Sequence, residues 1–367
     1  MSLGGSFLKT LLIGLAGLAN VGLILLFAAG YASAFLPPAW FWWTWLPASL
    51  LPFWAAGLLL ATAIHLLRGR WGYVALHAGL LALFLTRASL PWPSPPTSPD
   101  AASVLTVMSF NYTPFDRSVD QRPLLRNELG ALADTHAPDL IAMQSIRVFQ
   151  RRGQLAFSDQ LDTLATAGYH AEPEQNEASY LDTRVPLFQR SGPVLHQEPI
   201  VLPSQEDIER HVMRSELEWR GQPIVVYNVH LRSFERSHAL NLLARGRYRM
   251  AFRELVAVYR RDVLQRTHEA RELRALLDEE SQPTLLVGDL NASPFNWEYR
   301  HVRGTWLDPA AALGGNWRFT WHTRFPLARI DHVLASSHWQ PHAMQVDTTR
   351  ISDHYPLIVS LYLREDT

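Results

Sequence analysis

The feature that most constrains this 367-residue chain is a stretch of 27 residues without a charged side chain, Thr10–Leu36. Its sequence, TLLIGLAGLANVGLILLFAAGYASAFL, is apolar along almost its whole length. About 20 consecutive apolar residues are enough for a helix to cross a bilayer. The stretch therefore predicts a membrane-spanning helix.

Two further apolar segments follow. PPAWFWWTW, residues 37–45, combines a proline break with an aromatic cluster typical of a membrane–water interface. Trp45–Leu67 is predicted as a second span, and Gly72–Leu85 as a short third one. A signal peptide is not expected, because the first apolar run is too long, lacks a clear cleavage site and precedes two more apolar segments. Residues 1–90 are thus predicted to form three transmembrane helices.

The positive charges predict an orientation for these spans. Lys9, Arg68 and Arg70 should lie on the cytoplasmic side. Three crossings then place everything beyond residue 100 outside the cytoplasm, which in a bacterium means an anchor in the inner (cell) membrane and a periplasmic or extracellular domain. The proline-rich segment 91–102 is predicted to be a stiff, extended linker before a domain at 103–367.

Composition narrows the function classes. The chain has no cysteine, which excludes disulfides and thiolate metal sites. Residues 1–100 hold four of the 33 basic and one of the 34 acidic residues, so 29 basic and 33 acidic residues remain beyond them, a net charge of −4. A protein that grips long duplex DNA usually has a basic excess. The charge balance therefore counts against nucleic acid as a partner.

Beyond residue 100, strand-like and helix-like patterns alternate. The predicted strands are 104–112, 139–146, 185–190, 224–231, 284–291, 330–336 and 355–363. Helical patterns lie at 123–136 and over a long region from Ser237 to Glu280. No internal repeat is evident. Mixed strands and helices over this length predict a layered α/β domain.

The long helical region is rich in arginine. Its arginines include Arg245, Arg247, Arg249, Arg253, Arg260, Arg261 and Arg266. Only Glu254 and Asp262 oppose them within that stretch. Two interpretations stay open: an ordinary solvated helix face, or a surface that lies near anionic headgroups or a phosphorylated substrate.

Polar residues collect where the apolar strands end, which is where loops on a rigid sheet usually hold functional groups. They are Asn111, His230 in NVHL, Asp289 and Asn291 in VGDLNASP, Asp331 in RIDHVL, and Asp353 and His354 in ISDHYPL. Each motif alone is weak, because a single Asp can cap a turn and a single His can be structural. The ordered set, with every member beside an apolar strand, indicates a shared site.

This ordered set resembles the endonuclease/exonuclease/phosphatase superfamily of metal-dependent phosphoesterases. The resemblance covers residues 103–365 and is strongest in VGDLNASP, RIDHVLAS and SDHYPLIVSL. The superfamily includes DNase I-like nucleases, sphingomyelinases and inositol polyphosphate phosphatases. The resemblance implies a four-layer α/β sandwich with two central sheets. The anchor makes the architecture similar to that of membrane-anchored bacterial relatives, including teicoplanin-resistance proteins.

The resemblance also implies residue roles. Asp289 would orient or deprotonate the attacking water, and Asn291 would hold a phosphate oxygen and the water. His354 would contact the phosphoryl group, with Asp331 fixing its imidazole. His230 would contact phosphate or protonate the leaving oxygen.

The remaining roles concern substrate and metal. Asn111 would bind substrate and, with Asp353 and more weakly Gln144, a metal ion. Arg190 matches a family arginine near the site and would bind substrate. The implied ion is Mg²⁺ or Mn²⁺, because such a site offers oxygen ligands and one or two carboxylates.

One position departs from the family pattern. Most members have Gln-Glu where this chain has Gln144-Ser145, and that glutamate is the principal metal ligand. Three explanations stay open. In the first, another acid reaches the site from Glu172, Glu174 or Glu177. In the second, the metal is held by Asp353, Asn111 and Gln144 together with waters and substrate phosphates. In the third, the domain no longer hydrolyses and only binds a phosphorylated ligand.

The expected function is a membrane-anchored, divalent-metal-dependent hydrolase of a phosphomonoester, a phosphodiester or a lipid-linked pyrophosphate. Its expected partners are that phosphorylated substrate and membrane lipids, and no protein partner is apparent. A nuclease is one alternative. A silenced member that binds without turnover is the other, and metal-dependent activity that Asp289→Asn abolishes would separate the two.

Overall fold

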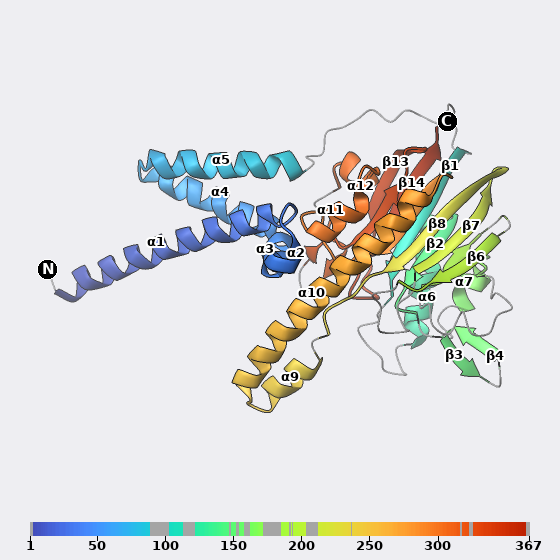
Figure 1. Ribbon diagram of the computed structural model, residues 1–367, viewed down its shortest axis with the longest axis horizontal. Helices are drawn as coiled ribbons and strands as arrows, with labels where there is room; N and C mark the ends of the chain where they lie inside the picture. The colour runs from blue at the N-terminus through green and yellow to red at the C-terminus, as the bar shows by residue number, and fades with distance from the viewer. Residues whose placement is uncertain are drawn as a thin grey trace. The chain divides into compact units, whose positions relative to one another are not determined.

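A computed structural model shows how the chain folds (Figure 1). It describes residues 3–88, 103–112, 122–146, 148–151, 154–157, 162–171, 185–190, 192, 194–202, 212–235, 237–315, 318–322 and 326–364. The predicted linker 91–102 lies outside these residues, as do Glu172, Glu174 and Glu177. The chain forms two compact units, one of Met1–Ser89 with Phe295–Trp297 and one of Leu90–Pro294 with Glu298–Thr367.

The first unit is helical. Its elements are α1 (Leu3–Ala32), α2 (Pro38–Phe41), η1 (Trp42–Thr44), α3 (Trp45–Ser49), α4 (Leu51–Leu67) and α5 (Trp71–Ala88). Within the described residues, Leu8–Ala32 and Trp71–Ala88 are long and apolar enough to cross a membrane. A third candidate exists if α2 to α3 and α4 together form one span.

The predicted second span, Trp45–Leu67, is broken rather than straight. The helical segments before and after Leu50 meet at an angle of 61°. Leu50 itself has φ −101° and ψ 11°, outside the helical range. Pro52 stands in the first turn of α4 and has no backbone N–H, so it cannot donate to the carbonyl four residues earlier. Proline chemistry therefore accounts for the bend.

The second unit contains two five-stranded sheets. The first has the order β13-β14-β1-β2-β5, with β1 (Val104–Asn111), β2 (Leu140–Gln144), β5 (Leu187–Gln189), β13 (Trp339–Val346) and β14 (Leu357–Leu363). The second has the order β12-β9-β8-β7-β6, with β6 (Val194–Ile200), β7 (Val212–Trp219), β8 (Gln222–His230), β9 (Thr284–Asp289) and β12 (Asp331–Ala335). Two strand pairs complete the described strands: β3 (Val148–Arg151) with β4 (Gln154–Phe157), and β10 (Trp321–His322) with β11 (Pro326–Ala328).

Each large sheet has a parallel pair near its centre. β1 and β2 run parallel, and so do β8 and β9, whereas the other neighbours in both sheets are antiparallel. A parallel pair needs a crossover connection. α6 (Arg122–His136) lies between β1 and β2 in the chain, and α9 (Ser237–Ala244) with α10 (Tyr248–Glu279) lies between β8 and β9.

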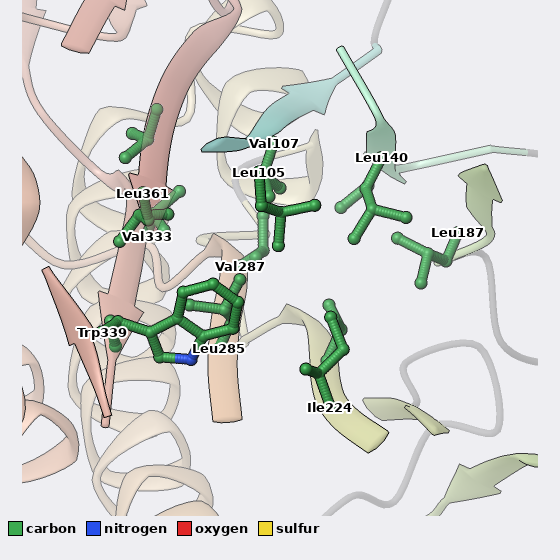
Figure 2. Close-up of a cluster of buried hydrophobic side chains, with 14 of the residues drawn as sticks. Leu105, Val107, Leu140, Leu187, Ile224, Leu285, Val287, Val333, Trp339 and Leu361 are labelled. Carbon is green, nitrogen blue, oxygen red and sulfur yellow. The ribbon is translucent and has the colours of Figure 1, made fainter. Parts of the chain in front are cut away.

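The two sheets pack face to face around one hydrophobic core. Figure 2 shows Leu105 and Val107 of β1 facing Leu285 and Val287 of β9. These residues alternate with others that point outward, because successive side chains on a strand face opposite sides of the sheet. Trp339 of β13 is fully buried in the same core.

Helices cover both outer faces. Leu129 and Leu132 of α6 pack with the outward-facing Met108 and Phe110 of β1. On the second sheet, the hydroxyl of outward-facing Tyr227 donates to Glu280, just after α10, at 2.6 Å. The order helix–sheet–sheet–helix confirms the predicted four-layer α/β sandwich.

The long helical region predicted at 237–280 is two helices. Gly246 has φ +70°, which a glycine adopts without steric cost. Its N–H donates to Leu243 at 2.9 Å, and the N–H of Arg247 donates to Leu242 at 2.9 Å. This hydrogen-bond pair is the Schellman arrangement that ends a helix. The remaining described helices are α7 (Asp162–Thr166), α11 (Trp297–Arg303) and α12 (Pro309–Ala312).

Candidate functional site

Strand alternation brings the predicted polar residues together. Residues at even spacings from them on the same strands belong to the core between the sheets: Val107, Ala142, Val226, Val287 and Val333. The same alternation therefore turns their side chains toward the space between the sheets, at one end of the sandwich. The residues that follow this pattern are Asn111, Gln144, Asn228, His230, Asp289 and Asp331.

Strand register places Asp289 at the centre of this group. Asp289 is the direct neighbour of His230 on β8 and of Asp331 on β12. The Oδ2 atom of Asp289 accepts a hydrogen bond from the Asn111 amide at 2.9 Å, which links the two sheets. The Nε2 atoms of His230 and His354 lie 3.7 Å and 3.9 Å from the same oxygen. Two imidazoles and an amide thus converge on one buried carboxylate.

His354 is held by Asp331. Its Nδ1 atom lies 2.8 Å from Oδ2 of Asp331, and both side chains are buried. Thr320 supports this aspartate, because its hydroxyl accepts the backbone N–H groups of Ile330 and Asp331, each at 3.1 Å. The pairing fixes the ring so that Nε2 is directed to the Asp289 side.

The pairing of His354 with Asp331 raises the pKa of the histidine and lowers that of the aspartate. Burial alone would lower the pKa of His354, but the charge and hydrogen bond of Asp331 raise it to about 9. Burial acts to raise the pKa of Asp331, yet the charge and hydrogen bond of His354 leave it below its ordinary value. At neutral pH the pair is therefore an imidazolium bonded to a carboxylate.

Asp289 behaves differently. Burial, followed by the charge of Asp331, raises its pKa to about 7, and His354 and two hydrogen bonds only partly offset this. A carboxylate whose pKa lies near neutrality is suited to general base catalysis. Asp289, rather than Asp331, is thus the better proton acceptor in the site.

The turn after β9 is held by a second set of bonds. Asn291 has φ +48°, a backbone conformation that asparagine tolerates better than most residues. Its N–H donates to Asp289 at 2.7 Å, and its side-chain amide donates to the carbonyl of Leu231 at 2.9 Å. The buried Arg266 of α10 donates to the Asn291 carbonyl. These contacts fix Asn291 beside Asp289.

The predicted metal side lies next to Asp289 on the first sheet. Asn111 and Gln144 are direct neighbours on β1 and β2. Ser352 donates to the Asn111 carbonyl at 2.7 Å and lies 3.5 Å from the half-buried Asp353 carboxylate. The Gln144 amide nitrogen donates to Asn228 at 2.8 Å, whereas its buried Oε1 has no hydrogen-bond partner in the part of the chain that the structure describes. An unused amide oxygen suits a hard divalent cation.

Ser145 follows Gln144 directly. It is half-buried and has φ +63°. A serine hydroxyl at this point is short and neutral, so it brings no negative charge to the metal side.

A second group also meets the geometry of a metal site. Ligand atoms of Asp289, Asp331 and His354 lie within 4.8 Å of one another, and all three residues are buried. In this group, however, one imidazole nitrogen and one carboxylate oxygen are already bonded to each other. The buried Oδ1 of Asp331 has no hydrogen-bond partner within the described residues.

Arg190 is not part of the site, contrary to the prediction from sequence. β5 runs antiparallel to β2, so Arg190 follows the end of β5 that lies beside the start of β2. Its N–H donates to Asp139 at 3.0 Å, and its guanidinium lies 5.2 Å from the centre of the Tyr169 ring. Asp139 is five residues from Gln144, which corresponds to about 16 Å along a strand.

Two buried residues contribute that the sequence analysis did not identify. Asn228 donates to the carbonyls of Met143, Val185 and Pro186 at 2.9–3.0 Å, while its Oδ1 fixes Gln144. Its signal in the sequence is its position two residues before His230, which puts it on the same strand face. Arg266 gives no comparable signal, because its neighbours in the sequence suggest a solvated helix.

Comparisons with known proteins agree with this geometry. Residues 115–354 match the model of the endonuclease/exonuclease/phosphatase family. The fold is similar to that of humanized D. rerio TDP2, which carries 14 mutations, at 17% identity and TM-score 0.51, over 71% of this chain and 99% of that one. D. rerio TDP2 complexed with a single-strand DNA product matches at 15% identity and TM-score 0.51, over 71% and 99%.

A functionally unknown conserved protein from Enterococcus faecalis V583 matches at 16% identity and TM-score 0.50, over 71% of this chain and 100% of that one. A search of curated proteins finds no match. At these identities the solved structures establish the fold alone. The family model, in contrast, spans most of the chain and includes Asp289, Asp331 and His354. The chain therefore belongs to the endonuclease/exonuclease/phosphatase family, whose members hydrolyse phosphoester bonds.

Proposed function

We propose that this protein is a membrane-anchored, divalent-metal-dependent phosphoesterase that acts outside the cytoplasm. The observation that supports this most strongly is the convergence of His230, His354 and Asn111 on the Asp289 carboxylate. A phosphoryl group needs a base for the attacking water and positive charge for its oxygens. The site contains both, and it lies at one end of a rigid sandwich.

In the proposed mechanism, Asp289 accepts a proton from the attacking water. Its pKa of about 7 lets it do so near neutral pH. His354, kept protonated by Asp331, donates a hydrogen bond to a phosphoryl oxygen. His230, on the other side of Asp289, contacts phosphate or protonates the leaving oxygen. Asn291 orients the water and a phosphate oxygen.

Asn111, Gln144 and Asp353 would hold the metal ion, with Mg²⁺ or Mn²⁺ as the fitting ions. All three residues offer oxygen ligands. Asp353 offers a carboxylate, and Gln144 offers an amide oxygen that has no hydrogen-bond partner among the described residues. Mg²⁺ prefers such ligands and keeps several waters. When bound, the ion supplies positive charge that offsets the charge of the phosphoryl and leaving oxygens.

The anchor favours a substrate in the membrane. Confinement near the bilayer raises the local concentration of a lipid-linked phosphate or pyrophosphate. DNA is the weaker candidate, although one structural relative holds a DNA product. The net charge of −4 beyond residue 100 opposes DNA binding.

A binding role without turnover is the second candidate function. It is favoured by Ser145, which stands where most members have the metal-binding glutamate. The site would then hold a phosphorylated ligand through its imidazoles and Asn111, and no bond would be cleaved.

The test is hydrolysis by the full-length protein in detergent with Mg²⁺, Mn²⁺ or Ca²⁺. The panel contains a generic phosphodiester, a lipid pyrophosphate and plasmid DNA, each with native protein and Asp289→Asn. Metal-dependent turnover by the native protein alone supports the enzyme, and the preferred substrate selects the class. Binding of a phosphorylated ligand with no turnover in any arm contradicts it and supports the second role.

A further inference from the structure

The hairpin formed by α9 and the start of α10 has an unusual surface. The two helices pack against each other, and Figure 1 shows the hairpin extending away from the sheets of its unit. Between Leu243 and Arg253 only Ala251 is buried. The large exposed apolar residues here are Leu240 (54%), Leu243 (36%), Tyr248 (70%), Met250 (52%), Phe252 (68%) and Val256 (39%). An apolar cluster of this kind on a soluble surface marks an interaction site.

The apolar residues of α10 form a stripe. Tyr248, Phe252 and Val256 are spaced four residues apart, so they lie on one face of the helix. Arg249 and Arg253 follow the first two by one residue each, so they form a parallel stripe beside the apolar one. A helix with adjacent aromatic and arginine stripes is typical of segments that lie in a membrane interface.

The charge of the hairpin has one sign. Residues 237–253 contain Arg245, Arg247, Arg249 and Arg253 and no Asp or Glu. All four arginines are exposed. A solvated helix face would pair such charges with acids at a spacing of four. The surface is thus complementary to a negatively charged, partly apolar partner, which is the chemistry of an anionic bilayer surface.

We propose that this α9–α10 hairpin docks on an anionic lipid bilayer, with the Tyr248, Phe252 and Val256 stripe at the level of the headgroups and the arginines on lipid phosphates. The proposal is independent of the catalytic role of the site, because none of these residues contributes to it. It gives the unit that carries the site a contact with the membrane other than the anchor.

The experiment uses the full-length chain, which has no native cysteine and so accepts single labels cleanly. Phe252→Cys carries an environment-sensitive fluorophore in nanodiscs that contain phosphatidylglycerol and a lipid-borne quencher. Leu195→Cys on β6, 50% exposed, is the matched control outside the hairpin, and Leu18→Cys in α1, 71% exposed, sets the quenching of a label in lipid. We expect strong quenching at residue 252 and little at residue 195.

The charge of the partner is tested on the same labelled protein. Arg249→Gln and Arg253→Gln should each reduce the ratio of docked to free hairpin by about five-fold. Arg220→Gln, at an exposed turn after β7, should have no effect. Nanodiscs of phosphatidylcholine alone should give weaker quenching, as should high salt.

Two results would overturn the proposal. One is quenching at residue 252 no greater than at residue 195 in anionic nanodiscs. The other is energy transfer between two labelled chains at residue 252 without lipid quenching, which would assign the surface to a second copy. Hydrolysis is not part of the readout, so an inactive protein with a quenched label would still support docking.

Discussion

At the scale of single residues, Asp289 gives the sharpest prediction. Asp289→Asn keeps the shape of the side chain but removes the proton acceptor, so turnover should fall by about 10²–10⁴-fold. The folded protein should not lose stability, because burial penalises the charged form and raises the pKa of this carboxyl to about 7. Activity and the thermal midpoint, both at pH 8, check the two effects. Asp278→Asn, an exposed carboxylate on α10, is the control and should change neither.

The pH dependence follows from His354. Its pKa is raised to about 9, so its imidazolium is present below that value and is lost as the pH rises through it. Activity that requires the imidazolium should therefore fall above about pH 9. Asp331→Asn removes the charge that raises the pKa and leaves burial, which lowers it, so the alkaline limb of kcat should move to lower pH. An unmoved limb would mean that another group controls it.

Ser145 gives a prediction about metal affinity. Ser145→Glu adds a carboxylate beside Gln144, and the half-saturating Mg²⁺ concentration should fall by about ten-fold or more. Serine and glutamate both have a Cβ atom, so the substitution adds no further steric clash at the backbone, which has φ +63° at this residue. Ser145→Gln, equally long but neutral, is the matched control. If it lowers the Mg²⁺ requirement as far as Ser145→Glu does, the effect is not due to charge.

The sequence made most site residues predictable at this scale, because motifs at strand ends follow a period of two. Asp289, Asp331 and His230 come together for that reason. Arg190 was placed wrongly because its position depends on the direction and register of β5, which the sequence does not state. Arg266 was missed because its burial depends on which face of α10 meets the loops after β8 and β9.

At the scale of elements, α10 stabilises the site through Arg266, which binds the turn that carries Asn291. Fully buried Arg266 donates to the Asn291 carbonyl and lies close to the charges of Glu298, Glu269 and Asp289. Removing one member of a buried charge group costs about 3–5 kcal/mol. Arg266→Gln should lower the free energy of unfolding by that amount and reduce kcat. Thermal unfolding and turnover test this, with exposed Arg260→Gln as the control, and an unchanged midpoint would contradict it.

The elements also show what sequence patterns detect. The seven predicted strands are all present because their buried apolar runs are clear. In the two large sheets, β6, β7 and β13 were missed, since β6 and β13 are edge strands and all three carry polar residues. The short pairs β3–β4 and β10–β11 were not predicted either. The end of α9 was missed because Gly246 interrupts a pattern that otherwise continues through arginines and apolar residues. Edge strands and helix ends depend on local hydrogen bonds, which cannot be predicted from hydrophobic periodicity.

At the scale of the whole molecule, the number of membrane spans decides which side of the membrane the unit with the candidate site occupies. Among the residues that the structure describes, two helices are long and apolar enough to span a membrane, and α2 to α4 supply a third span only if the two halves of the bent pair cross as one. With three spans and Lys9 in the cytoplasm, the C-terminus lies outside it. With two spans, the C-terminus returns to the cytoplasm. The compartment of the site therefore depends on whether this bent pair crosses the membrane or re-enters on the same side.

A C-terminal alkaline phosphatase fusion of the full-length chain in a bacterial host distinguishes these cases, because that reporter folds actively only outside the cytoplasm. We expect an active fusion, with a cytoplasmic reporter inactive at the same point. Fusion at Arg70, after the bent pair, should give the opposite pattern if that pair crosses as one span. An inactive phosphatase at the C-terminus would show that α2 to α4 re-enter rather than cross, and it would move the proposed substrate to the cytoplasmic leaflet while leaving the chemistry of Asp289 and His354 unchanged.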